Sequence, residues 1–284
     1  MPRPTTRRPR LLTTTLLLAG GALVLAGCGG KDSTTAAAAD CTPAHAGLKT
    51  LADGTLTVAV YVSPPSTKQQ GATFTGVDPS LIAKIAAMEC LTPKEQATSG
   101  AAVISQVQAS RVDLAIGGIY HSAERAKAVS LTDPVYQDGM AILSSAGYTD
   151  LDALKGHTVG VVQGALWNAD LQAVLGDGVK LYQDTASAKQ DLANGRIDAG
   201  VLSSAEAAYL AEGTDLEAEQ LAADDRVQAS TSSNDVVMAV DPRNDALLSA
   251  LNADIATLLA DGTIAKALSA NGMDASLAGS GAKG

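Results

Sequence analysis

The stretch YHSAERAKAVSLTDPVY at residues 120–136 contains a single arginine, Arg125, directly after the apolar run VDLAIGGI. The charged residues around it lack the i,i+4 ladder of a solvated helix. A guanidinium offers paired N–H donors that match a carboxylate in a bidentate fork. Arg125 is therefore a candidate anchor for an anionic ligand. The alternative is a surface ion pair with Glu124 or Asp133, which would contribute little to stability.

Aromatic side chains are scarce, and three of them stand where predicted elements begin or end. Tyr61 ends the first strand-like run, Tyr120 precedes the arginine segment, and Trp167 opens a predicted helix. Ligands in α/β proteins bind at such ends, where rings can stack on an apolar or cationic group. Packing under a loop or in the core is the alternative for each ring. Gly118, after Gly117, lets the backbone approach a ligand or turn tightly.

Residue types that support catalysis or metal binding do not form recognisable motifs. His45, His121 and His157 lie far apart without ligand spacing, and neither G-x-S-x-G nor H-E-x-x-H occurs. The sequence therefore predicts no metal site, no cofactor and no enzymatic activity.

The N-terminus reads as an export signal. A basic segment, MPRPTTRRPR, precedes the apolar run LLTTTLLLAGGALVLAG and then Cys28. This order resembles the bacterial lipobox, in which the cysteine becomes lipidated after cleavage; an ordinary signal peptide is the alternative. We expect a signal peptide at 1–27, a flexible small-residue tether at 28–47, and a lipid-anchored protein on the extracytoplasmic face of the cell membrane.

Two further cysteines, Cys41 and Cys90, remain in a chain that is expected to reach an oxidising compartment. Their simplest state there is a disulfide, although two buried free thiols are the alternative. The bond would join the N-terminal segment to the end of the helix that finishes at AAMEC.

The charge of the chain argues against nucleic-acid binding. The formal net charge is −10, and removing the four arginines of residues 1–27 leaves sixteen basic residues against thirty acids, or −14. Binding to nucleic acid depends on neutralising phosphates, so such a chain is a poor candidate.

Apolar runs alternate with helical patterns along most of the chain, which predicts α/β sheets with parallel strands. The helix DPSLIAKIAAMEC at 78–90 is expected to begin with Asp78 as N-cap and Pro79 at its first position. The predicted strands are LTVAVYV, VDLAIGG, MAILSS, HTVGVVQG, VKLYQD, IDAGVL and DVVMAV.

From about residue 48 to 275 the chain resembles the family 3 extracellular solute-binding proteins, receptors of polar-amino-acid ABC transporters. The segments that carry this are GTLTVAVYVSPP, GVDPSLIAKIA, ISQVQASRVDLAIGGI, SAERAKAVSLTDPVYQDG, LKGHTVGVVQG, DLANGRIDAGVLSSAEA and IATLLADGTIAKAL, in this order. The resemblance implies a two-lobed, type II periplasmic-binding-protein-like α/β fold, with a mostly parallel sheet in each lobe and a hinge between them. The expected boundaries are 48–140 with 242–276 for lobe 1, 141–241 for lobe 2, and 277–284 for a disordered tail.

The resemblance also implies a role for individual residues. In the family, the arginine of a T/S-x-x-R element binds the α-carboxylate of the ligand, and here that element is Ser122 to Arg125. Family members often carry hydroxyls after V-x-x-G, whereas this chain has Gln163-Gly164-Ala165, so that only backbone N–H groups could serve there. The family aspartate that pairs with the ligand's ammonium is missing near Ser203, and Glu206 follows one helical turn later.

Together these expectations describe a monomeric receptor that binds a small polar, carboxylate-bearing solute, an amino acid or a derivative, and delivers it to an ABC permease. The same fold includes a few dehydratases, so a dehydratase-like enzyme is one alternative. A sensory lipoprotein that binds a partner protein is the other.

Overall fold

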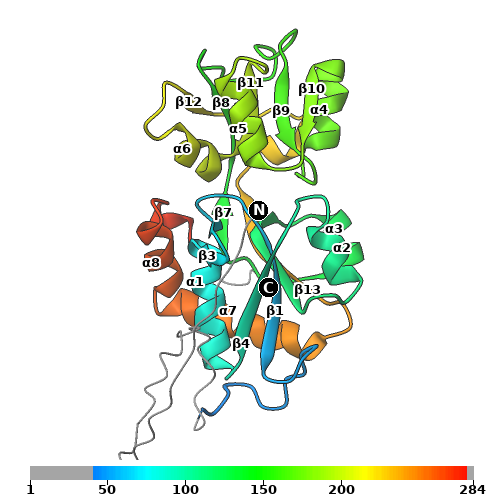
Figure 1. Ribbon diagram of the computed structural model, residues 1–284, viewed down its shortest axis with the longest axis vertical. Helices are drawn as coiled ribbons and strands as arrows, with labels where there is room; N and C mark the ends of the chain where they lie inside the picture. The colour runs from blue at the N-terminus through cyan, green and yellow to red at the C-terminus, as the bar shows by residue number, and fades with distance from the viewer. Residues whose placement is uncertain (1–40, 280–284) are drawn as a thin grey trace, which may run out of the picture. The chain divides into compact units, whose positions relative to one another are not determined.

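The computed structural model describes residues 41–279 of the chain, which fold into two α/β lobes, each built on its own sheet (Figure 1). The expected two-lobed α/β fold is thereby confirmed. Cys28, the signal peptide and the first part of the expected tether lie outside the described residues.

The sheet of the first lobe has six strands in the order β4-β1-β5-β13-β6, and β7 also pairs with β13. Strand β1 runs parallel to β4 and β5, whereas β13 is antiparallel to its neighbours. The strands are β1 (Thr55–Tyr61), β4 (Thr92–Thr98), β5 (Leu114–Tyr120), β6 (Ser130–Leu131), β7 (Tyr136–Asp138) and β13 (Asn234–Val240). The helices of this lobe are α1 (Val77–Met88), α2 (Val103–Gln108), α3 (Ala123–Ala128), α7 (Asp245–Ala260) and α8 (Thr263–Ala270), and a hairpin consists of β2 (Lys68–Gln70) and β3 (Thr73–Thr75).

The sheet of the second lobe has the order β10-β9-β11-β8-β12. Strand β9 is parallel to β10 and β11, and β8 is antiparallel to β11 and β12. Its strands are β8 (Met140–Ser144), β9 (Val159–Val162), β10 (Val179–Tyr182), β11 (Ala199–Ser203) and β12 (Glu217–Gln220). Its helices are α4 (Asn168–Leu175), α5 (Thr185–Ala193) and α6 (Ser204–Ala211). The 3-10 turns within residues 41–279 are η1 (Gly176–Gly178), η2 (Gln228–Ser230) and η3 (Ala275–Leu277).

Two expectations about the sheets need correction. The first is that each lobe has a mostly parallel sheet. Each sheet is mixed, because the strand that arrives from the other lobe, β8 or β13, runs antiparallel to the helix-connected strand beside it. Strand β13 was expected in lobe 2, within 141–241, but it pairs with β5, with Val236 opposite Tyr120. Its apolar sequence suits a buried position in either sheet, so only the pairing assigns it to the first lobe.

Helix α1 is positioned by a buried carboxylate. Its apolar face is buried as its spacing predicts, through Leu81, Ile82 and Ile85. The helix begins at Val77 after Gly76, so Asp78 is not its N-cap. The Asp78 carboxylate instead accepts hydrogen bonds from the Gly117 and Gly118 N–H groups, each 3.0 Å away, and from the Tyr136 hydroxyl at 2.9 Å. The N-cap position falls to Gly76, whose φ of 119° disfavours any side chain.

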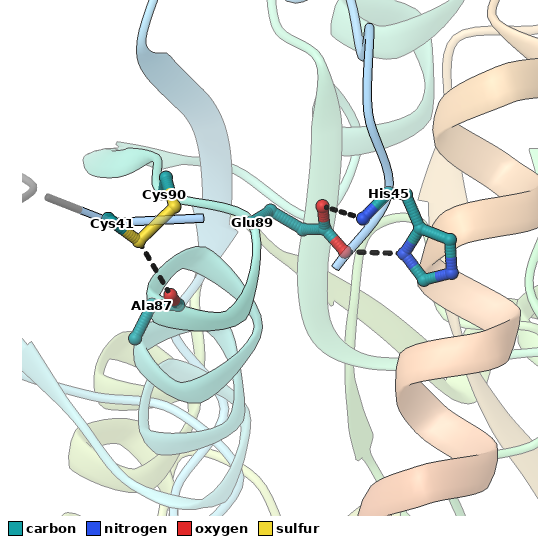
Figure 2. Close-up of a disulfide and its surroundings, with 5 residues drawn as sticks. All are labelled: Cys41, His45, Ala87, Glu89 and Cys90. Atoms are coloured by element: carbon teal, nitrogen blue, oxygen red, sulfur yellow. Dashed lines mark hydrogen bonds and ion pairs between the residues drawn. A yellow bond between two sulfur atoms is a disulfide. The ribbon is translucent and has the colours of Figure 1, made fainter. Parts of the chain in front are cut away.

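The described part of the expected tether is attached to the first lobe. Cys41 and Cys90 form a disulfide, with their Cα atoms 5.7 Å apart (Figure 2). The Ala44 N–H donates to the Met88 carbonyl at 2.9 Å. Residues 41–47 are therefore held against the C-terminal end of α1 and do not belong to a flexible linker.

The expected disordered tail also needs a correction for its first residues. Ala278 forms a β-bridge with Tyr136, and the Gly279 N–H donates to the Val135 carbonyl at 3.1 Å. Residues 277–279 therefore pack on the first lobe. In residues 41–279, no single helix is long and apolar enough to cross a membrane; α7 and α8 pass that test only jointly, and they are bent by 75°.

Candidate functional site

A cavity lies between the two lobes and is lined by residues of both. The ends of β1, β5, β9 and β11 meet there, which is where open α/β sheets bind their ligands. The lining residues used below are Tyr61, Ser63, Gly100, Gly118, Tyr120, Arg125, Gln163, Gly164, Ala165, Trp167, Ser203 and Glu206.

Arg125 lies on α3, next to the end of β5, and faces this cavity. Its Nη1 donates to the Tyr120 carbonyl at 2.5 Å, and its Nη2 donates to the Gly164 carbonyl of the second lobe at 2.9 Å. Burial lowers the pKa of the guanidinium. Within residues 41–279 it forms no ion pair, so neither Glu124 nor Asp133 neutralises it as a surface partner would. Arg125 is thus a positive charge in a groove that is shared by both lobes.

The structure brings the predicted site residues together with one exception. Ser122 does not line the cavity; its hydroxyl caps α3 by accepting the Arg125 N–H at 3.1 Å. The others that the sequence singled out all line it: Tyr61, Gly118, Tyr120, Arg125, Gln163, Ala165, Trp167 and Ser203.

In three of these residues the backbone N–H group already has a hydrogen-bond partner within the protein. The Gln163 N–H donates to the Tyr182 carbonyl at 2.8 Å, and the Ala165 N–H donates to the Val162 carbonyl at 3.2 Å. The Gly118 N–H is bound by Asp78. Since these donors already have partners, side chains carry more of the polar chemistry of the cavity than the sequence suggested.

Two aromatic residues of the cavity, Tyr120 and Trp167, pack against each other. The rings of Tyr120 and Trp167 pack edge to face with centroids 5.8 Å apart, and the Tyr120 hydroxyl donates to the Gly139 carbonyl at 2.7 Å. The Trp167 Nε1–H is buried and has no hydrogen-bond partner among the described residues. Buried indole N–H groups usually find an acceptor, so this donor is available to a bound molecule.

Glu206 is the functional candidate that the sequence left undecided. It lies on α6, is buried, and accepts a hydrogen bond from the Thr185 hydroxyl at 2.8 Å. Burial raises the pKa of this carboxyl to about 7, although the hydroxyls of Thr185 and Ser63 partly oppose the shift. The one indication of Glu206 in the sequence was the segment Ser203-Ser204-Ala205-Glu206, which has the spacing of a capping box. Ser203 does cap α6 through the Glu206 N–H, but Glu206 also lines the cavity.

The cavity therefore has one basic and one acidic group, which lie apart. Among the described residues that line it, Arg125 is the one basic residue and Glu206 the one acidic residue, and they come from different lobes. A small zwitterion, with a carboxylate at one end and an ammonium at the other, complements this arrangement.

Two glycines allow the lobes to approach each other beside Arg125. A Cβ added at Gly164, whose φ is 88°, would lie 2.4 Å from the Gly100 carbonyl oxygen of the first lobe. Real Cβ atoms never come this close to a carbonyl, so a side chain here would hold the lobes apart.

Comparison with known proteins identifies a family and several relatives with a similar sequence or structure. A model of the bacterial extracellular solute-binding proteins, family 3, matches residues 56–271. The L-cystine-binding protein TcyJ of Escherichia coli (strain K12) is 28% identical over 218 residues, which cover 74% of this chain and 80% of that protein.

Solved structures with the same fold include the substrate-binding protein of an amino acid ABC transporter, with 25% identity, a TM-score of 0.69, and coverage of 77% of this chain and 99% of that one. An ancestral arginine-binding protein bound to glutamine has 26% identity, a TM-score of 0.69, and coverage of 78% and 98%. Given its match over residues 56–271 and its two-lobed fold, the chain belongs to the bacterial extracellular solute-binding proteins, family 3.

Proposed function

We propose that this protein is an extracytoplasmic receptor that binds an amino acid, or a closely related derivative, between its lobes and delivers it to an ABC permease. The observation that carries this proposal is the cavity with one half-buried guanidinium, that of Arg125, and one buried carboxyl group, that of Glu206, on opposite lobes. The family assignment supports it, as do the relatives that are named for binding cystine or arginine.

Arg125 is the proposed anchor for the α-carboxylate of the ligand. Its guanidinium now donates to two neutral carbonyl oxygens, and a carboxylate is a stronger acceptor that fits the same fork. Water screens the attraction between guanidinium and carboxylate less in the cavity than in bulk solvent. The bidentate geometry offsets the cost of removing both groups from water.

Glu206 is the proposed partner of the ligand's ammonium group, in place of the carboxylate that is missing near Ser203. Its buried side chain has no cationic partner among residues 41–279. A bound ammonium would supply one and would favour the ionised form. Trp167, with its free indole N–H, would contact the rest of the ligand.

We further propose that the protein functions as a monomer held at the membrane by lipid on Cys28. The support is the order of basic segment, apolar run, small residues and cysteine in the first 28 residues. A membrane anchor would keep the receptor close to its permease.

A dehydratase-like enzyme is the second candidate function, and the raised pKa of Glu206 is the observation that favours it. A carboxyl group with a pKa of about 7 in a cavity is suited to general acid catalysis. The ancestral amino acid-binding protein AncCDT-1, described as a precursor of cyclohexadienyl dehydratase, shares the fold at 22% identity. Turnover of a carboxylated substrate that Glu206→Gln abolishes would establish the enzyme; binding without turnover supports the receptor.

Calorimetry with paired ligands tests the receptor. We expect one of the amino acids named for the relatives, arginine, glutamine or cystine, to bind with 1:1 stoichiometry. Its decarboxylated counterpart, such as agmatine for arginine, should not bind, because Arg125 would have no carboxylate to hold. Arg125→Ala should weaken binding by at least about 100-fold while circular dichroism stays unchanged.

The control variant is Arg111→Ala, which removes an exposed arginine of the same lobe that does not line the cavity. It should bind like the wild type. Unchanged affinity in Arg125→Ala, or equal binding of amino acid and amine, would refute the proposed anchor.

A further inference from the structure

Three potential metal ligands meet on the first lobe, away from the cavity. His45 belongs to the N-terminal segment, Glu89 follows α1, and Asp254 lies in the middle of α7. Glu89 is adjacent to Cys90, so the disulfide and this cluster hold the same end of α1 (Figure 2). His45, Glu89 and Asp254 lie far apart in the sequence, so they form no motif with the spacing of metal ligands.

The three side chains converge on one point. The His45 Nδ1 lies 2.5 Å from the Glu89 Oε1 and 3.9 Å from the Asp254 Oδ1. One potential ligand atom from each residue lies within 4.8 Å of the other two. The second Glu89 oxygen accepts the His45 backbone N–H at 3.0 Å, which fixes the orientation of this carboxylate (Figure 2).

Asp254 provides the independent observation that points to a ligand. Its side chain is 1% exposed, and neither of its oxygens has a hydrogen-bond partner among the described residues. Glu89 is equally enclosed at 2%, and the one base of residues 41–279 within ion-pair distance of these carboxylates, His45, already pairs with Glu89. Buried carboxylates without a partner are costly, and those found in proteins are paired or coordinate a metal.

We propose that His45, Glu89 and Asp254 bind a divalent cation, Zn²⁺ in preference to Mg²⁺ or Ca²⁺. One imidazole nitrogen and two carboxylate oxygens form a donor set that zinc accepts, whereas magnesium and calcium favour oxygen ligands alone. Zinc bonds to these atoms are about 2.0–2.2 Å long, so small side-chain rotations would bring all three ligands onto one ion.

The exposure of the three residues defines the rest of the site. His45 is 37% exposed while both carboxylates are enclosed, so solvent reaches the site from the imidazole side. A water molecule would complete a four-coordinate shell there. The ion would join the N-terminal segment to α1 and α7, which makes its role structural.

Zinc titration of the protein, purified without a histidine tag and treated with EDTA, tests this inference. Calorimetry should show one Zn²⁺ per chain, and zinc should raise the Tm. His45→Ala and Asp254→Asn should each weaken zinc binding by at least about 100-fold, since even residues outside the ligand shell contribute 10- to 100-fold. His45→Ala changes a partly exposed side chain, so it provides a folded variant if Asp254→Asn does not fold.

The matched control is His157→Ala. His157 Nδ1 also faces a carboxylate, Asp198, at 3.5 Å, but both side chains are partly exposed and no third acid of the described residues joins them. This variant should bind zinc like the wild type. No zinc binding by the wild type, equal binding by His45→Ala, or loss of binding in His157→Ala would overturn the site. Amino acid binding in the cavity is measured separately, so neither result depends on the other.

Discussion

At the scale of single residues, the proposed ligand contacts depend on one basic and one acidic side chain of the cavity. The sequence indicates the basic residue more clearly than the acidic one. Arg125 stands in a recognisable element after a buried strand, and the structure places it in the groove. Glu206 lies three residues after Ser203, where the helical cap alone would account for it. Its orientation depends on Thr185, which comes from a different helix and donates to its carboxylate.

The raised pKa of Glu206 predicts a pH-dependent stability. The folded protein holds this proton up to about pH 7, whereas the unfolded chain releases it near the ordinary value of 4.5. Between these values the folded state binds more protons, so the free energy of unfolding falls as pH rises. Glu206→Gln stays neutral, so its stability relative to wild type should increase from pH 5 to pH 7.5 by roughly 2–3 kcal/mol.

Urea denaturation of the ligand-free proteins at both pH values measures this difference, and the comparison of variant with wild type cancels other titrating groups. Amino acid binding should tighten from pH 6 to pH 8 in the wild type, as Glu206 ionises, and stay flat in the variant. The same stability difference at both pH values would contradict the assignment of this pKa to Glu206.

At the scale of elements, α1 and β5 are joined by one buried side chain. Asp78 in the first turn of α1 binds two N–H groups of β5, and Tyr136 of β7 donates to the same carboxylate. Gly117 needs its φ of 133°, and a Cβ there would lie 2.4 Å from the Tyr61 carbonyl oxygen. This contact sets the position of the β5 end, and therefore that of the arginine segment that follows.

Asp78→Ala should reduce the free energy of unfolding by about 3 kcal/mol or more, because it leaves three buried donors without an acceptor. Asp78→Asn keeps one acceptor oxygen and should lose less. The comparison variant is Asp184→Ala, which removes the exposed cap of α5 and should cost about 1 kcal/mol. Urea denaturation checks all three, and an Asp78→Ala loss no larger than that of Asp184→Ala would contradict this role.

At the scale of the whole molecule, both lobes contribute to the cavity because the chain crosses between them. Only Gly139 separates β7 of the first sheet from β8 of the second, and β13 brings the chain back. Arg125 already contacts Gly164 across the groove. A ligand that binds both lobes would favour the arrangement in which they lie together, which is the signal that a receptor presents to its permease.

The disulfide affects the whole chain through its unfolded state. Cys41 and Cys90 are 49 residues apart, and the chain-entropy model assigns roughly 4 kcal/mol to a loop of this length. A Cys41→Ser, Cys90→Ser double variant should lose a stability of this order in urea denaturation. Without reductant, the wild type should show no reactive thiol at either position. Reaction of both thiols, or unchanged stability of the double variant, would contradict a stabilising bond.

The sequence by itself determined the features that depend on local patterns. Apolar periodicity revealed most strands and helices, including the buried face of α1, because it reflects which side of an element is buried. The family resemblance placed Arg125 and the two-lobed fold. Strand β4 was missed, because TPKEQAT is a polar edge strand without an apolar alternation.

Only the tertiary structure decided which distant segments meet. It assigned β13 to the first sheet, brought Glu206 to the cavity, and placed His45 beside Glu89 and Asp254. Each of these depends on contacts between residues that are far apart in the chain. The period of a helix or strand defines which face is buried, but it does not specify the partner against which that face packs.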